Sequence, residues 1–231
     1  MAAAQSQVDG GPAALAELCR LYWYPLYVFA RRHGHSPEDA EDLTQGFFLH
    51  LLEHRAISRV DRLKGKFRSF LLASFRNYRS IEVRRAQCLK RGGRCEFVNL
   101  DLQGAESRYL LEPVDSLTPE KIFDAQWAMT LLDRAMTLLS QEYAIEDKTP
   151  TFEMLKAFLD FSKPPPPYEQ AAEALQVSVP SVKTLVHRLR RRFAAILREE
   201  VARTVSDPVE VDGEIHALCD ALIAARGRLV L

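Results

Sequence analysis

The sequence contains no long apolar run and few cysteines, and these two shortages narrow the classes of protein to consider. No stretch approaches the roughly 18 apolar residues that a membrane-spanning helix needs. The opening residues, MAAAQSQVDGGP, lack the basic and apolar segments of a secretory signal. Of the four cysteines only Cys88 and Cys95 lie close together, and no neighbouring histidine completes a zinc set. We therefore expect a folded cytoplasmic protein with reduced thiols and no metal site.

Motifs of catalysis and of cofactor binding are also missing. The sequence has no glycine-rich phosphate loop, no HExxH motif, no nucleophile elbow and no pair of carboxylates in an apolar setting. We expect a protein that binds and positions other molecules, with no catalytic residues and no cofactor.

The net charge is zero, because 31 basic residues balance 31 acidic ones, but the charges are segregated along the chain. Residues 36–52 hold four acidic residues and no Lys or Arg, whereas residues 55–94 carry a net charge of +11. Residues 96–124 are acidic, with a net charge of −5, and residues 181–198 carry +6. Such blocks create local fields that attract a polyanion even when the whole molecule is neutral.

Apolar residues recur at helical spacing through most of the chain, and no segment alternates as a strand would. The sequence predicts an all-α protein with two small helical domains joined by an acidic linker. The predicted parts are a disordered N-terminus (1–12), a first helical domain (13–95), the linker (96–119), a second helical domain containing a helix-turn-helix (120–203) and a C-terminal helical extension (204–231).

The stretch SPEDAEDL in the first domain has strong signals for the start of a helix. Ser36 can cap it, Pro37 suits its first position, and the carboxylates that follow are favoured by the helix dipole. Its apolar stripe should be buried. The residues left for another surface are Asp39, Asp42, Gln45 and Leu49.

A third helix, from about residue 67 to 86, mixes aromatic and basic residues. Its period places Phe70 and Phe75 in the core, while the basic side chains form a cationic face suited to a nucleic-acid backbone. The residues that we predict to contact DNA here are Arg76, Asn77, Arg84 and Arg85.

The second domain contains YEQAAEALQVSVPSVKTLVHRLRRRF, which reads as helix, turn, helix. Ser178 can cap the second of these helices, whose start would contact bases in the major groove while nearby cations hold phosphates. Arg190 and Arg192 should point away from the DNA or flank it. The predicted DNA-facing residues are Ser181, Lys183, Thr184, His187, Arg188 and Arg191.

Three motifs together resemble bacterial sigma factors of the extracytoplasmic-function (ECF) type, from the sigma-70 family. SPEDAEDLTQGFF is similar to the helix that docks on the clamp helices of the RNA polymerase largest subunit. FRSFLLASFRNYRSIEVRR is similar to the segment that captures and melts the minus-ten promoter element, and the helix-turn-helix to the reader of the minus-thirty-five element. The order and spacing also match, over roughly residues 15–197.

The resemblance implies core RNA polymerase and promoter DNA as partners, with an anti-sigma factor or other regulator left open. It places Asp42 and Gln45 at polymerase contacts and gives the loop 57–66 the recognition of a flipped-out base. Two residues depart from the family pattern. Gly46 stands where an acidic residue is frequent, and Gln176 where glycine is usual, which costs about 1 kcal/mol if its φ is positive.

Two other classes of function stay open on the sequence alone. A helix-turn-helix transcriptional regulator that is not a sigma factor would leave the basic helix at 67–86 without a role. An interaction protein, such as an adaptor or anti-sigma partner, would use its basic segments only as solvated faces. The extension resembles that of an ECF subgroup, and we expect it either to pack against the second domain or to serve as a regulatory docking helix.

Overall fold

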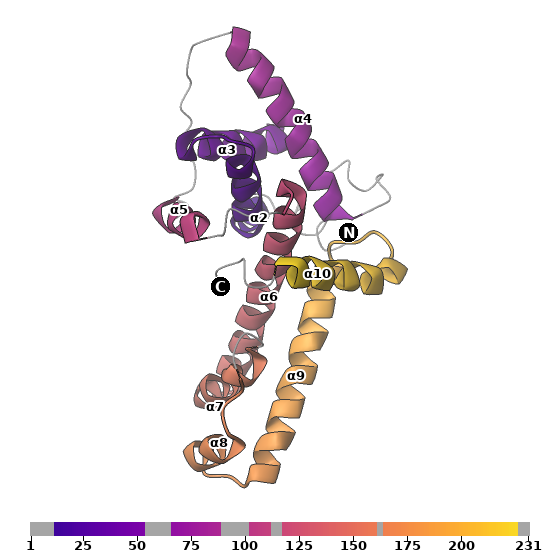
Figure 1. The fold of residues 1–231 in the computed structure, drawn as a ribbon. Coiled ribbons are helices and arrows are strands. Elements are labelled where there is room, and N and C mark those ends of the chain that lie inside the picture. The colour runs from indigo at the N-terminus through magenta and orange to yellow at the C-terminus, as the bar shows by residue number, and fades with distance from the viewer. Residues whose placement is uncertain (1–11, 54–65, 89–101, 112–116, 161–163, 226–231) are drawn as a thin grey trace. The chain divides into compact units, whose positions relative to one another are not determined.

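The computed structural model describes residues 12–53, 66–88, 102–111, 117–160 and 164–225. Over these ranges the regular structure is helical, apart from one isolated antiparallel bridge between Lys66 and Val205 (Figure 1). The predicted all-α class is therefore confirmed for this part of the chain. None of the helices in the described ranges has the length and apolarity to cross a bilayer.

The chain forms two compact units. Unit 1 comprises residues 1–130 and 201–231, and unit 2 comprises residues 131–200. The chain thus leaves unit 1 within helix α6 (Pro119–Ile145) and returns within helix α9 (Val179–Ala202). Unit 1 is discontinuous in sequence, which the predicted division into successive domains did not anticipate.

Aromatic side chains from several helices form the core of unit 1. Helices α2 (Pro12–Arg32), α3 (Pro37–Glu53) and α4 (Phe67–Cys88) each contribute one fully buried phenylalanine, namely Phe29, Phe47 and Phe75. The start of α6 adds Phe123 and Trp127, and the Trp127 ring stacks on Tyr22 of α2 with a centroid distance of 4.0 Å. Because the burial of aromatic surface dominates core energetics, the start of α6, up to residue 130, is an integral part of this unit.

The turn between α2 and α3 follows the local signals in the sequence. Gly34 has a φ of +85°, a conformation that favours glycine, and it separates the two helices. The Ser36 hydroxyl accepts a hydrogen bond of 3.0 Å from the backbone N–H of Asp39, which confirms Ser36 as the N-cap of α3.

A short helix, α5 (Leu102–Leu111), lies inside the segment predicted as a linker, and it packs against α2. The Glu106 carboxylate accepts hydrogen bonds from the guanidinium of Arg31, at 2.7 Å, and from the hydroxyl of Tyr27. The Arg31 guanidinium also lies over the ring of Tyr109. This part of the acidic segment is therefore fixed to unit 1 by charge and ring contacts.

The C-terminal extension forms α10 (Val211–Ala225), preceded by the 3₁₀ turn η3 (Pro208–Glu210). Val211, Leu218 and Ala225 are buried along one side of α10, and the helix belongs to unit 1. We expected the extension either to pack against the second domain or to serve as a regulatory docking helix. In the structure, a buried carboxylate on this apolar side, Glu214, pairs with Lys66 and Arg68 at the start of α4.

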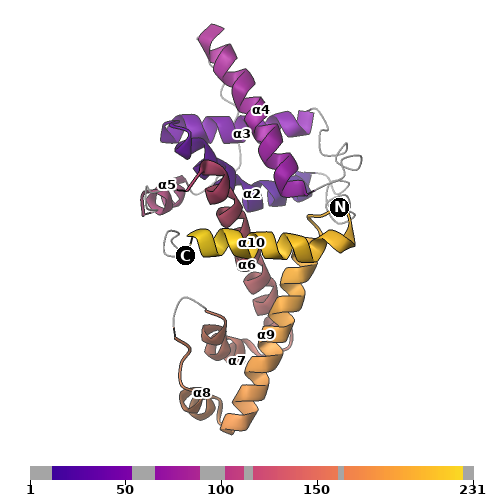
Figure 2. The same ribbon diagram turned by 45° about the vertical axis from the view of Figure 1, so that its right-hand side comes forward.

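Unit 2 contains the rest of α6, α7 (Thr149–Leu155), the 3₁₀ turn η2 (Lys156–Leu159), α8 (Tyr168–Leu175) and most of α9 (Figure 2). One apolar stripe of α9 enters its core, as the sequence predicted. The buried residues of this stripe are Val182, Val186, Leu189, Phe193 and Ile196.

The turn between α8 and α9 requires a left-handed backbone. Gln176 has φ 53° and ψ 41°, and its N–H bonds to the carbonyls of Ala172 and Glu173, which ends α8. The positive φ that was considered for this position is thus present on a residue with a side chain. Before α8, Pro167, the last of four consecutive prolines, has φ −59° and ψ 138°, a polyproline II conformation.

Candidate nucleic-acid interface

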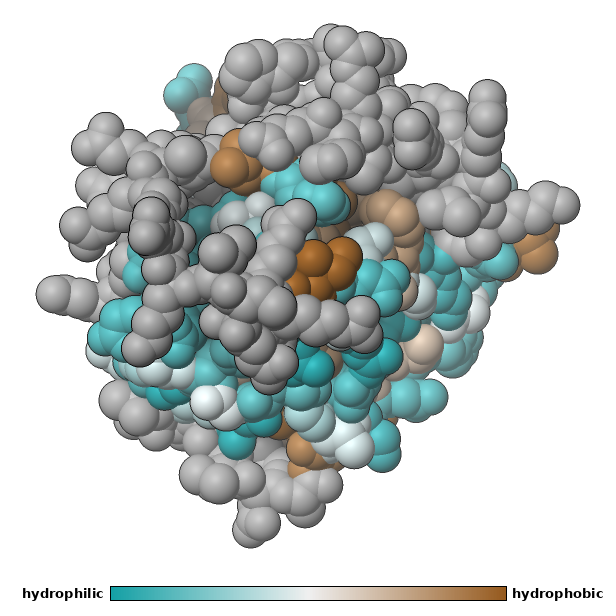
Figure 3. All heavy atoms as spheres, turned by 90° about the horizontal axis from the view of Figure 1, so that it is seen from above, coloured by the Kyte–Doolittle hydropathy of each residue, from teal (hydrophilic) through white to brown (hydrophobic). Residues whose placement is uncertain are grey.

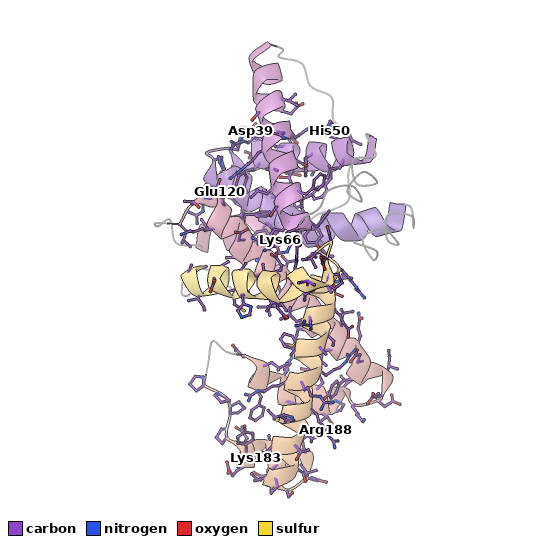
Figure 4. All side chains as sticks on the ribbon, turned by 90° about the vertical axis from the view of Figure 1, so that its right-hand side faces the viewer. Asp39, His50, Lys66, Glu120, Lys183 and Arg188 are labelled. Carbon is purple, nitrogen blue, oxygen red and sulfur yellow. The ribbon has the colours of Figure 1, made fainter. Side chains whose placement is uncertain are left out.

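The predicted polymerase-facing residues of α3 lie on a mostly accessible face. Asp39, labelled in Figure 4, and Asp42 are exposed, whereas Gln45 and Leu49 are half-buried. The Gln45 amide donates a hydrogen bond of 2.8 Å to the Glu41 carboxylate, so its side chain is held along the helix. Burial raises the pKa of Glu41, and the nearby carboxylates of Asp42 and Glu38 raise it further. The carboxylates of this face are therefore close enough for the charge of one to raise the pKa of another.

Gly46 in the middle of α3 has a packing role. A Cβ atom at this position would lie 2.5 Å from the hydroxyl oxygen of Tyr78 on α4. The glycine therefore makes room for a tyrosine whose ring also lies 5.8 Å from Phe47 and 5.3 Å from His50. This contact gives a physical reason for the absence of the acidic residue that is frequent at this position in the resembled family.

Helix α4 buries its aromatic side and exposes part of its basic side. Phe75 is fully buried, Phe70 is half-buried, and both Arg76 and Asn77 are exposed. The side chains of Arg84 and Arg85, within the same helix, lie outside the described residues, as does the predicted base-recognition loop up to residue 65. The structure thus displays two of the four predicted α4 contacts on one accessible surface.

The Arg76 guanidinium is engaged within unit 1. It forms an ion pair with Glu120 in the first turn of α6, and it lies 5.6 Å from the centroid of the Phe29 ring. Burial lowers the pKa of neighbouring Arg79, and the charge of Arg76 lowers it further. The guanidinium groups of Arg76 and Arg79 are therefore close enough on α4 to affect one another.

The arginines of α9 have different surroundings. The Arg190 guanidinium donates to the carbonyl oxygen of Phe158, at 3.0 Å and 3.3 Å. Arg192 bonds to the Glu142 carboxylate at 2.5 Å and 2.8 Å, and to Glu199 at 3.3 Å. These contacts hold Arg190 and Arg192 against unit 2.

The predicted DNA-facing side of α9 is exposed at all six positions. Within the described ranges, neither Arg188, labelled in Figure 4, nor Arg191 forms an ion pair, so both guanidinium groups are able to donate to a phosphate. The Lys183 ammonium lies 5.6 Å from the centroid of the Tyr168 ring, and the Thr184 hydroxyl donates to the Pro180 carbonyl at 3.1 Å. The Ser181 hydroxyl lies 2.8 Å from that of Ser178, and His187 is exposed on the next turn.

The rest of the described surface offers no competing site of metal chemistry. Across the described ranges, no group of three or more His, Cys, Asp or Glu side chains could hold a metal ion. Seen from above in Figure 3, the described surface is mainly hydrophilic, with isolated apolar residues. A surface of this kind is better suited to binding polar partners than to binding a partner with a continuous apolar surface.

In a comparison with known protein families, one family model matches the part of the chain that contains α3 and α4. Residues 21–87 match the family model of Sigma-70 region 2. The match supports a sigma factor of the sigma-70 family. This region 2 segment runs from the middle of α2 to one residue before the end of α4, and so contains both the acidic face and the basic helix. No curated protein and no solved structure matches the chain.

Sequence reasoning did not predict that Lys66 and Arg68, which lie within the residues that match region 2, meet two carboxylates from outside them, those of Asp124 and Glu214. A signal for Glu214 was present, because it follows Val211 by three residues and precedes Leu218 by four, on the apolar side of its helix. A carboxylate on such a stripe is expected to be buried with a partner.

Proposed function

We propose that the chain is a sigma factor of the ECF type, which binds core RNA polymerase and directs it to specific promoters. The observation that carries this proposal is the region 2 match across the acidic face of α3 and the basic helix α4. A Sigma-70 region 2 that contains both surfaces implies that the chain interacts with core RNA polymerase. The polymerase would then supply the chemistry of transcription.

The surfaces divide the work of initiation. The α3 face, with Asp39, Asp42, Gln45 and Leu49, would dock on the polymerase. Helix α4 would hold the separated minus-ten strand, because exposed cationic and amide groups such as Arg76 and Asn77 can bind its backbone and bases.

Helices α8 and α9 would read the minus-thirty-five element as a helix-turn-helix. Ser181, Lys183 and Thr184 lie near the start of α9, where a recognition helix contacts base edges. Arg188 and Arg191 are exposed further along the same side and would hold phosphates. The geometry of α8, turn and α9 also suits a transcriptional regulator that is not a sigma factor, which makes this the second candidate.

Reconstitution with core RNA polymerase tests the proposal. We expect the purified chain to bind core enzyme and to give permanganate-reactive thymines at a cognate promoter. Asn77→Ala should reduce that reactivity more than it reduces binding to duplex DNA, because Asn77 is proposed to hold unpaired strand. Gln141→Ala, which removes an exposed amide from unit 2, is the matched control.

Two results would contradict this function. If Asn77→Ala shows wild-type thymine reactivity, the assignment of strand opening to α4 is wrong. A chain that binds specific duplexes but never associates with core polymerase would instead be a helix-turn-helix regulator.

A further inference from the structure

The segment between α9 and α10 is joined to the start of α4 by backbone contacts. The N–H of Phe67 donates to the carbonyl oxygen of Thr204 at 2.8 Å, and Lys66 forms the antiparallel bridge with Val205. Thr204 and Val205 are both buried. Figures 1 and 2 show this segment beside the first turn of α4. Residues far apart in the sequence thus fix the position at which α4 begins.

Side-chain charges form a second joint at the same place. Glu214 is fully buried, and its carboxylate lies 2.7 Å from the Lys66 ammonium and 3.0 Å from Nε of Arg68. Arg68 is itself buried and also pairs with Asp124 of α6. Figure 4 shows Lys66 immediately beside α10. We call these four residues, Lys66, Arg68, Asp124 and Glu214, the charge cluster.

The charge cluster is electrostatically complete, since it holds two cations and two carboxylates. Burial acts to raise the pKa of Glu214, but hydrogen bonds from Arg68 and Lys66 outweigh burial and lower it. The carboxylate is therefore ionised and serves as a fixed acceptor. Removing it would leave the buried Arg68 guanidinium with only part of its partners, which is more costly than removing an exposed charge.

The cluster bears on the DNA-facing part of α4. Arg76 and Asn77 follow Arg68 by eight and nine residues, about 12 to 14 Å along the helix axis. A helix transmits a tilt of its first turn along its length, so the anchor at Arg68 helps to set where those two side chains lie. Asp124 and Glu214 both lie outside the residues that match region 2.

We propose that Glu214 is a positioning residue for strand opening, through which the C-terminal extension holds the first turn of α4. This role rests on the proposed sigma-factor function and assigns a task to the extension. Glu214 acts through Lys66 and Arg68 and does not itself contact DNA.

The test compares Glu214→Gln with Glu210→Gln in the full chain assembled with core polymerase. Glu210 is an exposed carboxylate in η3, so its variant matches the change in charge without disturbing the cluster. Core binding, minus-thirty-five duplex binding and permanganate reactivity are measured at a temperature where circular dichroism shows all proteins folded. We expect Glu214→Gln to lose most of the reactivity while both binding affinities stay unchanged.

A template with an unpaired minus-ten region separates positioning from general destabilisation. It should restore much of the transcription to Glu214→Gln, because the strands no longer need to be opened. If Glu214→Gln does not fold, Glu214→Asp takes its place, since the shorter side chain keeps the buried charge but draws the carboxylate back from Lys66 and Arg68. A partial loss of reactivity is then expected.

If the Glu214 variant and the Glu210→Gln control show equal permanganate reactivity, the positioning role is overturned. The sigma-factor function is then left intact. Loss of core binding in parallel with reactivity would also overturn it, because Glu214 would then act on the whole fold. A wild-type chain that opens no promoter would overturn both proposals.

Discussion

At the scale of single residues, positions 188–192 hold four arginines whose surroundings differ. Arg190 and Arg192 are bound to a carbonyl oxygen and to carboxylates of unit 2, whereas Arg188 and Arg191 are exposed and form no ion pair among the described residues. A helix turns through 100° per residue, so the arginines of one run meet different surroundings. The hydrogen bond that Arg192 donates to the Glu142 carboxylate raises the pKa of this guanidinium.

Arg188→Ala should therefore weaken DNA binding, whereas Arg192→Ala should change it little. We expect Arg188→Ala to lower the dependence of log affinity on log salt by about one, because one phosphate contact is lost. Salt-titrated binding of the full chain to minus-thirty-five duplexes measures this. Equal losses in the two variants would mean that the arginines act only through their summed charge.

Gln176 is a residue in a strained conformation, and it allows a test of stability. Gln176→Gly should stabilise the protein by about 1 kcal/mol, because a left-handed backbone costs a residue with a Cβ about that much. The midpoint and slope of urea denaturation report the change. The same substitution at Gln170, exposed within α8, should instead destabilise by about 1 kcal/mol. A loss of stability in both variants would contradict the strain at Gln176.

At the scale of the helix, α3 combines a buried apolar stripe with a separate acidic face. Replacing Asp42 and Gln45 together by Ala should leave the fold intact and weaken binding to core polymerase, since neither side chain is part of the core. A pull-down titration with core enzyme, supported by circular dichroism, measures both expectations. Asp220→Ala combined with Gln141→Ala removes the same residue types elsewhere, and core affinity equal to that of this control would contradict the assignment.

Local signals in the sequence predicted the helices well and their long-range contacts poorly. The Ser36 cap and the buried stripe of α9 are properties of neighbouring residues, so spacing alone was enough to find them. The pair of Arg68 and Glu214 joins residues 146 positions apart, and no local period encodes which helix meets which. The same reason explains Gly46, because its role depends on Tyr78 of another helix.

Contacts with other side chains also determine which of the predicted site residues are available to bind a partner. Sequence spacing placed the six α9 residues on one exposed side, and the structure agrees. Spacing could not reveal that Arg76 pairs with Glu120, because the acidic partner lies beyond a segment without strong periodicity. An exposed ion pair of this kind contributes little stability, so Arg76 can exchange Glu120 for a phosphate at small cost.

At the scale of the whole molecule, the discontinuity of unit 1 affects how the protein is made. A ribosome releases residues 1–130 well before residues 201–231, yet both stretches belong to the same unit. Until α10 has been synthesised, Arg68 lacks the Glu214 carboxylate and Phe67 lacks the Thr204 carbonyl. Although domains generally fold in the order of translation, unit 1 cannot be completed on the nascent chain until α10 has emerged.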